Sequence, residues 1–82
     1  MSYSRARIRL NNTHEANEFV KMINSDGTTD KYTIEDLYGR QRVNARSLIG
    51  VIYALTEFND EMYILNESND KKLPYFIDKY RV

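Results

Sequence analysis

The chain has 82 residues, of which 41% are hydrophobic, so it can bury one small core and no more. Its 12 basic and 12 acidic residues balance, which excludes a whole-molecule field that would attract nucleic acid or an anionic membrane. Cysteine is absent and histidine occurs once, which excludes a disulfide framework and a thiolate metal site and leaves no histidine cluster for zinc.

The first predicted element is a strand over residues 5–10, because apolar and basic residues alternate there. One face would carry Ala6, Ile8 and Leu10, and the other would carry Arg5, Arg7 and Arg9. A phosphate-rich ligand could use this row of arginines. We favour pairing of the arginines with Glu35 or Glu61 across strands, because an open sheet face must be solvated.

A helix is predicted after the polar break at residues 11–13. Its apolar face has the spacing i, i+3, i+4, i+7 and consists of Ala16, Phe19, Val20 and Ile23. Asn12 and Glu15 have the spacing of a capping box, and Gly27 can supply a left-handed residue after the helix ends. We therefore expect the helix to begin near Asn12.

Two further strands are predicted around Ile34 and Val43, joined by a tight turn at Gly39. A second helix can start from Asn44, a good N-cap residue. Its apolar residues would be Leu48, Ile49, Ile52 and Leu55. Gly50 inside this helix costs on the order of 1 kcal/mol relative to alanine, which indicates a close approach of another backbone segment.

The remaining chain predicts a fourth strand around Met62 and Ile64, and then a short helix with Pro74 in its first turn. The apolar residues of this last helix are Leu73, Phe76, Ile77 and Tyr80. The order βαββαβα predicts an α+β fold, with helices on one face of a mainly antiparallel four-stranded sheet. A ferredoxin-like arrangement fits the same order of elements.

We expect residues 1–82 to form a single domain, because no repeat, linker or low-complexity tract divides them. The sequence has no apolar run of signal-peptide or transmembrane length. The expected location is therefore the cytoplasm, with no association with a membrane.

Residues 43–52, VNARSLIGVI, with Gly39 and Arg40 upstream, resemble the region around the regulatory serine of HPr. HPr is the histidine phosphocarrier of the bacterial sugar phosphotransferase system. The resemblance implies an open-faced sandwich, in which three helices cover a four-stranded antiparallel sheet. It also implies that Ser47 is a regulatory phosphorylation candidate. The residues implied in partner binding are Arg46, Leu48, Ile49 and Ile52.

A phosphate on Ser47 would lie at a helix start, where the backbone amides and Arg46 or Arg42 could engage it. The structural alternative is that Ser47 only satisfies backbone groups of the first turn. If the apolar residues after Ser47 are exposed, they form a docking patch, and if they are buried, they belong to the core.

The family's phosphorylated histidine stands at the start of the first helix, followed two residues later by an arginine and then by a proline. His14 lies in this neighbourhood, but Glu15 and Ala16 follow it, so neither helper residue is present. If the apolar face of the first helix is aligned with that of the family, the histidine position is taken by Asn12 or a neighbouring residue. Glu15 and Glu18 would repel a phosphoryl group by roughly 1 to 4 kcal/mol per charge near a surface.

We therefore expect an HPr-like protein related to the phosphotransferase system that acts as a regulatory or protein-interaction module. We do not expect an enzyme, a metal or a cofactor. The expected partners are proteins, which the resemblance suggests are phosphotransferase components, a kinase or a transcription regulator. Two alternatives stay open: an active phosphocarrier that relays phosphate through His14, and a small structural module that forms a homo-oligomer without phosphate chemistry.

Overall fold

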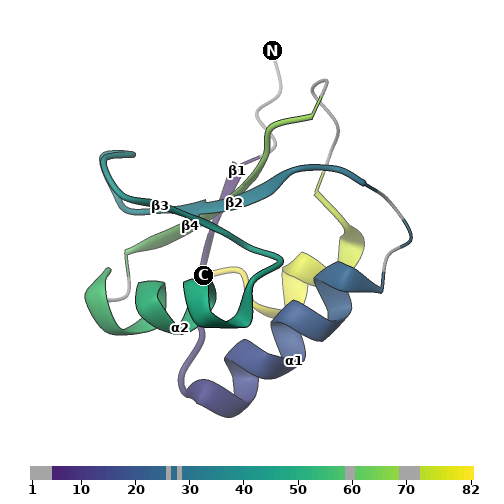
Figure 1. Cartoon of the computed structure of the whole chain (residues 1–82), viewed down its shortest axis with the longest axis horizontal. Helices are drawn as coiled ribbons and strands as arrows, with labels where there is room; N and C mark the ends of the chain where they lie inside the picture. Colours follow the sequence, from purple (N-terminus) through teal and green to yellow (C-terminus); the bar gives the residue numbers. More distant parts are fainter. Residues whose placement is uncertain (1–4, 26, 28, 59–60, 69–72) are drawn as a thin grey trace.

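The computed structural model describes residues 5–25, 27, 29–58, 61–68 and 73–82. Its elements in chain order are β1 (Arg5–Ile8), α1 (Thr13–Asn24), β2 (Tyr32–Glu35), β3 (Arg42–Asn44), α2 (Leu48–Glu57), β4 (Met62–Asn66) and the 3-10 helix η1 (Tyr75–Lys79). The four strands form one antiparallel sheet in the order β1-β4-β2-β3. Figure 1 shows α1, α2 and η1 on the same side of this sheet. The predicted α+β class and antiparallel four-stranded sheet are confirmed.

The core lies between the sheet and the helices. In the centre of the sheet, Ile64 of β4 stands opposite Ala6 of β1 and Ile34 of β2. The period of two along each strand turns these residues toward the helices, and the predicted face of α1 packs onto them. The largest side chains with less than 2% exposure are Ile8, Leu10, Phe19, Ile23, Ile34, Val51, Met62, Ile64 and Ile77.

The start of α1 is as the sequence predicts. Asn12 is the N-cap, and its side-chain oxygen accepts a hydrogen bond of 2.9 Å from the backbone N–H of Glu15. The Glu15 carboxylate in turn accepts a hydrogen bond of 2.8 Å from the backbone N–H of Asn11, one residue earlier than a standard capping box. Two polar side chains thus satisfy backbone donors at this helix end.

The predicted start of the second helix at Asn44 is wrong. Asn44 is the last residue of β3, where it pairs with Thr33, and its side chain accepts a hydrogen bond of 2.9 Å from the backbone N–H of Arg46. Ser47 is the N-cap instead, and α2 begins at Leu48. Pairing with β2 holds the backbone of Asn44 in the sheet, so the helix starts only after the chain has turned.

The close approach predicted at Gly50 is confirmed. A Cβ atom at Gly50 would lie 3.2 Å from the backbone oxygen of Asn44 and 3.4 Å from Cβ of Val43. Glycine therefore lets α2 pack directly against the end of β3, which fixes the direction in which the helix leaves the sheet.

The predicted third helix is not an α-helix but the 3-10 helix η1, which has five residues. Pro74 precedes it with an extended backbone, and after it the chain turns to pair with β1. The backbone N–H of Arg9 donates to Tyr80 O at 2.9 Å, and that of Val82 donates to Arg7 O at 3.0 Å. These bonds hold the chain after η1 against β1.

Within the described segments, neither α1 nor α2 has the length and apolar character needed to cross a bilayer.

Candidate functional site

The first candidate site is the α2 patch, which consists of Leu48, Ile49 and Ile52. Ile49 is 83% exposed and Leu48 is 37% exposed, whereas Ile52 packs partly against the core. Helix α2 buries Val51 and Ala54 on its inner side, so Ile49 faces outward. The nine residues from Leu48 to Thr56 include no charged side chain. A helical segment that has no charge and exposes large apolar side chains is typical of a protein contact surface.

Ser47 lies at the N-terminal end of this patch and is half-buried. Its hydroxyl oxygen accepts a hydrogen bond of 3.1 Å from the backbone N–H of Gly50, and its backbone oxygen accepts one of 2.9 Å from Val51. Ser47 thus satisfies two backbone donors of the first helical turn. A phosphate at this position would lie at the positive end of the α2 dipole, which is the favourable end for an anion.

Replacing Ser47 with alanine is expected to destabilise the protein by about 1 kcal/mol, because the first turn of α2 loses its cap. Ser47→Asp, which keeps a side-chain acceptor, is expected to remain close to the original stability. Urea unfolding followed by circular dichroism measures both changes. Thr56→Ala is the matched control, since its hydroxyl only donates to Ile52 O within the helix. Equal stability of Ser47→Ala and the unchanged protein would contradict the capping role.

Neither of the two arginines expected near Ser47 is directed toward it. The Arg46 guanidinium donates to Ile23 O at 3.1 Å, to Asn24 Oδ1 at 3.3 Å, and twice to Asp30 O, at 3.0 and 3.1 Å. It also lies 5.2 Å from the centre of the Tyr32 ring. Arg46 therefore joins the last turn of α1 to the segment that leads into β2, which is a structural role in addition to the predicted partner binding.

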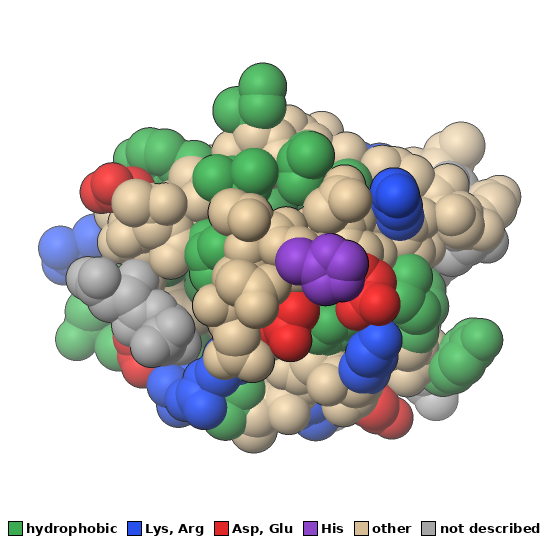
Figure 2. All heavy atoms as spheres, turned by 90° about the horizontal axis from the view of Figure 1, so that it is seen from below, with side chains coloured by type: hydrophobic (Ala, Val, Ile, Leu, Met, Phe, Trp, Pro, Cys, Tyr) green, Lys and Arg blue, Asp and Glu red, His purple; other side chains and the backbone are tan. Residues whose placement is uncertain are grey.

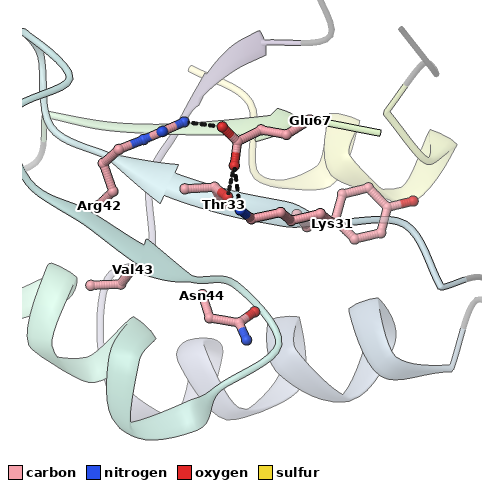
Figure 3. Close-up of a pocket in the computed structure, with 7 residues that line it drawn as sticks. Lys31, Thr33, Arg42, Val43, Asn44 and Glu67 are labelled. Carbon is pink, nitrogen blue, oxygen red and sulfur yellow. Dashed lines mark hydrogen bonds and ion pairs between the residues drawn. The ribbon is translucent and has the colours of Figure 1, made fainter. Parts of the chain in front are cut away.

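Arg42 belongs to a network of ion pairs on the outer face of the sheet. Its guanidinium contacts Glu35 at 3.5 Å and also donates a hydrogen bond to Glu67. The Thr33 hydroxyl donates to the other Glu67 oxygen at 2.6 Å (Figure 3). Glu35 is also bound by Arg5 at 2.8 Å. Arg7 likewise lies 3.1 Å from Glu61, so both predicted pairings of the β1 arginines are confirmed.

This network borders a hollow of about 260 Å³ that β2 and β3 line together with the chain after β4. Its lining residues are Lys31, Tyr32, Thr33, Arg42, Val43, Asn44 and Glu67 (Figure 3). Glu67 lies between the two cations, with Lys31 at 3.8 Å and Arg42 in contact. The charges in the hollow are thus paired with one another, and their main effect is to clamp the sheet.

The hydrogen bond from Thr33, together with the charges of Arg42 and Lys31, lowers the pKa of Glu67 against the opposing effect of partial burial. Because the pKa of Glu67 is lower in the folded chain than in the unfolded chain, ionised Glu67 stabilises the fold at pH values above its unfolded pKa. This stabilisation is lost as the pH falls through the folded pKa. We expect Glu67→Gln to cost about 1 kcal/mol at pH 7 and to reduce the loss of stability on acidification. Urea unfolding at pH 7 and at several lower pH values measures the free energy of unfolding and its dependence on pH. Glu57→Gln, at the exposed end of α2, is the control, and an equal effect there would contradict the clamp.

His14 is the second residue of α1 and is exposed. Asn12, not His14, occupies the cap at the mouth of this helix. Figure 2 shows the single histidine of the chain with acidic side chains beside it. Hydrogen bonds from Lys79, at 3.0 Å, and from Tyr80, at 2.9 Å, lower the pKa of Glu18, and the charge of His14 has a smaller effect in the same direction. The carboxylate of Glu18, an acidic residue whose charge interacts with His14, is thus itself bound by the Lys79 ammonium and the Tyr80 hydroxyl.

The sequence reasoning missed three exposed side chains, one on α2 and two in the turn between β2 and β3. Tyr53 is 48% exposed, and its hydroxyl donates a hydrogen bond of 3.1 Å to the side chain of Gln41. Leu37 and Tyr38, in the turn between β2 and β3, are 41% and 75% exposed. Helical spacing could have found Tyr53, since it stands four residues after Ile49 on the same face. The exposure of a turn residue has no such periodic signal.

Comparisons of the chain with protein-family models, with curated proteins and with solved structures returned no match. Across the part of the chain that the structure describes, no three histidine or acidic side chains gather where they could hold a metal ion. The function is therefore inferred from the residues and geometry of this chain.

Proposed function

We propose that this protein is an HPr-like interaction module that docks protein partners of the phosphotransferase type through the α2 patch. In this proposal Ser47 is the regulatory phosphorylation site, and no phosphate is relayed through His14. The observation that carries the proposal is the exposure of Ile49, at 83%, on a helix that begins directly after Ser47 and has no charged side chain before Glu57.

The arrangement of the fold supports this proposal. A four-stranded antiparallel sheet with its helices on one side is the coarse architecture that the resemblance implies. The resembling segment, residues 43–52, forms the end of β3, the turn to the second helix and the first half of α2. The serine of that segment stands at a helix start, next to exposed apolar side chains.

The surroundings of His14 favour this function over the phosphocarrier. A phosphoryl group on His14 would meet Glu15 and Glu18 rather than an arginine, and Asn12 already caps the helix. Repulsion of this kind near a surface is on the order of 1 to 4 kcal/mol. This corresponds to a decrease in occupancy of about fivefold to nearly a thousandfold. A carrier has to accept its phosphate readily, so His14 is a poor acceptor.

Phosphorylation assays test the proposal. With the serine kinase of the phosphotransferase system, the γ-phosphoryl group of ATP would be transferred to Ser47 Oγ, and ADP and the hydroxyl proton would be released. We expect mass spectrometry to find one acid-stable phosphate on Ser47 and none in Ser47→Ala. With phosphoenolpyruvate and the first enzyme of the system, we expect no acid-labile phosphate. Stoichiometric acid-labile phosphate on His14 would overturn the proposal in favour of the carrier.

Docking is tested separately by nuclear magnetic resonance with the ¹⁵N-labelled chain and that first enzyme. We expect the amide signals of residues 48–53 to shift and Ile49→Ser to weaken binding by about tenfold or more. Val82→Ser is the control, because Val82 is an exposed apolar residue at 56%, outside α2. A stable homo-oligomer that Ile49→Ser dissociates would instead favour the structural module.

A further inference from the structure

The two edges of the sheet differ in what covers them. The strand order β1-β4-β2-β3 makes β1 and β3 the edge strands. The chain's own C-terminal segment lies along β1, where Arg81 forms an antiparallel bridge with Ile8. On the side of β3 that faces away from β2, none of the described segments forms a strand pair. Among the strands that the structure describes, β3 therefore has the open edge (Figure 1).

The hydrogen-bond pattern decides which backbone groups face this open edge. Just outside β3, Gln41 O and Ala45 N each form a backbone hydrogen bond with the β2 side of the ladder, at 3.1 and 3.0 Å. In an antiparallel ladder every second residue bonds to the neighbouring strand, so Val43 also bonds toward β2. The backbone N–H and C=O groups of Arg42 and Asn44 therefore point away from β2.

Three of these four outward groups have no hydrogen-bond partner among the described residues. They are the N–H and the C=O of Arg42 and the N–H of Asn44. The fourth group, the carbonyl oxygen of Asn44, accepts a hydrogen bond of 3.0 Å from Ser47 N and lies against Gly50. The open edge thus presents two donors and one acceptor in a row.

The side chains of β3 leave this backbone accessible. Sheet edges are commonly protected by lysine, proline or a bulge. The strand consists of Arg42, Val43 and Asn44, and its register with β2 is continuous, so it has none of these devices. The guanidinium of Arg42 contacts Glu35 and Glu67, which draw it over the outer face of the sheet and away from the edge (Figure 3).

Helix α2 lies beside β3 and places apolar side chains next to the open backbone. A Cβ atom at Gly50 would lie 3.4 Å from Cβ of Val43. One turn further along α2, the Tyr53 hydroxyl donates to the Gln41 side chain at 3.1 Å. Helix and strand thus run side by side in opposite directions. Tyr53 is 48% exposed, and Ile49, four residues earlier on the same helix face, is 83% exposed.

We propose that the open edge of β3 binds an extended segment of a partner protein, which adds to the sheet as a further strand. This inference rests on the proposed function and adds to it the conformation and chemistry of the partner. An extended backbone carries donors and acceptors at the spacing of Arg42 and Asn44. Side chains alternate along it, so one set would pack on Tyr53 and Ile49 and the other would face the charged outer side of the sheet. The partner segment therefore alternates apolar and polar residues.

A second copy of this chain fits the edge less well than such a segment. Two-fold symmetry would pair the two β3 strands antiparallel. Pairing centred on Arg42 would set the two Arg42 side chains opposite each other, where like charges repel. Pairing centred on Val43 or Asn44 would need Asn44 O as an acceptor, although it already binds Ser47 N. A strand of different sequence avoids both conflicts.

The probes are short capped peptides in which valine and threonine alternate. One is unmodified, one is N-methylated at its valines, and one is N-methylated at its threonines. Alternate amides of a strand point to the same edge, so only one of the two sets can face β3. We expect the unmodified peptide to shift the amide signals of residues 42–44 and 49–53 of the ¹⁵N-labelled chain. We expect one N-methylated peptide to bind about tenfold more weakly and the other to bind like the unmodified peptide.

Two results with these peptides would overturn the inference. The first is absence of binding by the unmodified peptide. The second is equal binding of the two N-methylated peptides, because the backbone edge would then not be recognised.

Arg42→Pro and Arg42→Ala form a matched pair of variants. Both lose the ion pairs of Arg42, but only proline also removes the N–H that faces the open edge, and this N–H takes no part in pairing with β2. We expect Arg42→Pro to bind the unmodified peptide about tenfold more weakly than Arg42→Ala. Equal binding would overturn the inference. Circular dichroism checks that both variants fold, and if Arg42→Pro does not, the N-methylated peptides decide.

Two tyrosine variants test the contribution of α2. Tyr53→Ser is expected to weaken binding of the unmodified peptide by about tenfold. Tyr75→Ser is the control and is expected to leave binding unchanged, since Tyr75 is 88% exposed on η1. Equal binding of these two variants would overturn the contact with α2.

The first enzyme of the phosphotransferase system separates this inference from the proposed function. If Ile49→Ser weakens binding of that enzyme but no peptide shifts the signals of residues 42–44, the inference fails and the α2 patch stands. If neither the enzyme nor the peptide binds, both fail. Sedimentation equilibrium is expected to show a monomer. A dimer that Arg42→Pro dissociates and Arg42→Ala does not would overturn the partner segment in favour of a second copy.

Discussion

Arg46→Ala is expected to destabilise the protein by about 2–3 kcal/mol. The reason is that the guanidinium donates hydrogen bonds to Ile23 O, to Asn24 Oδ1 and twice to Asp30 O, all between 3.0 and 3.3 Å. Its removal would leave the last turn of α1 and the segment before β2 without these donors. The free energy of unfolding from urea denaturation measures the loss.

Two further variants show whether this effect comes from the geometry of Arg46. Arg46→Lys is expected to recover less than half of the loss, because a single ammonium cannot donate in the planar fork that reaches both carbonyl oxygens. Arg40→Ala, in an exposed turn, is expected to change stability by less than about 0.5 kcal/mol. If Arg46→Ala keeps full stability and loses only partner binding, Arg46 acts solely in docking and the structural role is wrong.

Phe19→Ala is expected to have the largest effect on stability, about 3–5 kcal/mol. Phe19 is fully buried at the centre of α1, and its ring packs edge-to-face on Tyr80 with 5.4 Å between the ring centres. A small domain is stable by roughly 5–15 kcal/mol, so this variant would approach the unfolded state. Thermal and urea unfolding followed by circular dichroism measure the change.

The Phe19 variant also tests whether the segment after η1 depends on the core. Tyr80 is held by the Phe19 ring and by a hydrogen bond of 2.9 Å to Glu18. In Phe19→Ala we expect the amide of Arg9, which donates to Tyr80 O, to exchange hydrogen faster with solvent. Tyr75→Ala serves as the control, because Tyr75 is exposed and contributes no core packing. A loss below about 1 kcal/mol in Phe19→Ala would contradict the packing described above.

Some features of the fold could be predicted because they depend on neighbouring residues. The spacing of apolar residues in α1 shows which side chains the helix buries, and Asn12 followed by Glu15 marks its start. Alternation likewise shows which face of β1 is buried. Gly50 indicated a close backbone approach, and the structure places Asn44 O beside it.

Other features depended on residues far apart in the sequence. Asn44 and Ser47 are both good N-cap residues, and pairing of Asn44 with Thr33 in the sheet decided between them. The contacts of Arg46 reach 16 and 23 residues back along the chain. Exposure of the turn at Tyr38 and its link to α2 through Tyr53 also required the folded chain.

The sequence by itself therefore determined the class of the fold, the buried faces of its elements and the position of the apolar segment after Ser47. Periodicity and capping depend on residues only a few positions apart, so the order of neighbouring residues is enough to determine these features. Only the tertiary structure decided that α2 begins after Ser47, that Arg46 bridges two elements, and that Tyr53 of α2 contacts Gln41 at the end of the β2–β3 turn. These features arise from contacts between distant segments, which exist only once the sheet has brought those segments together.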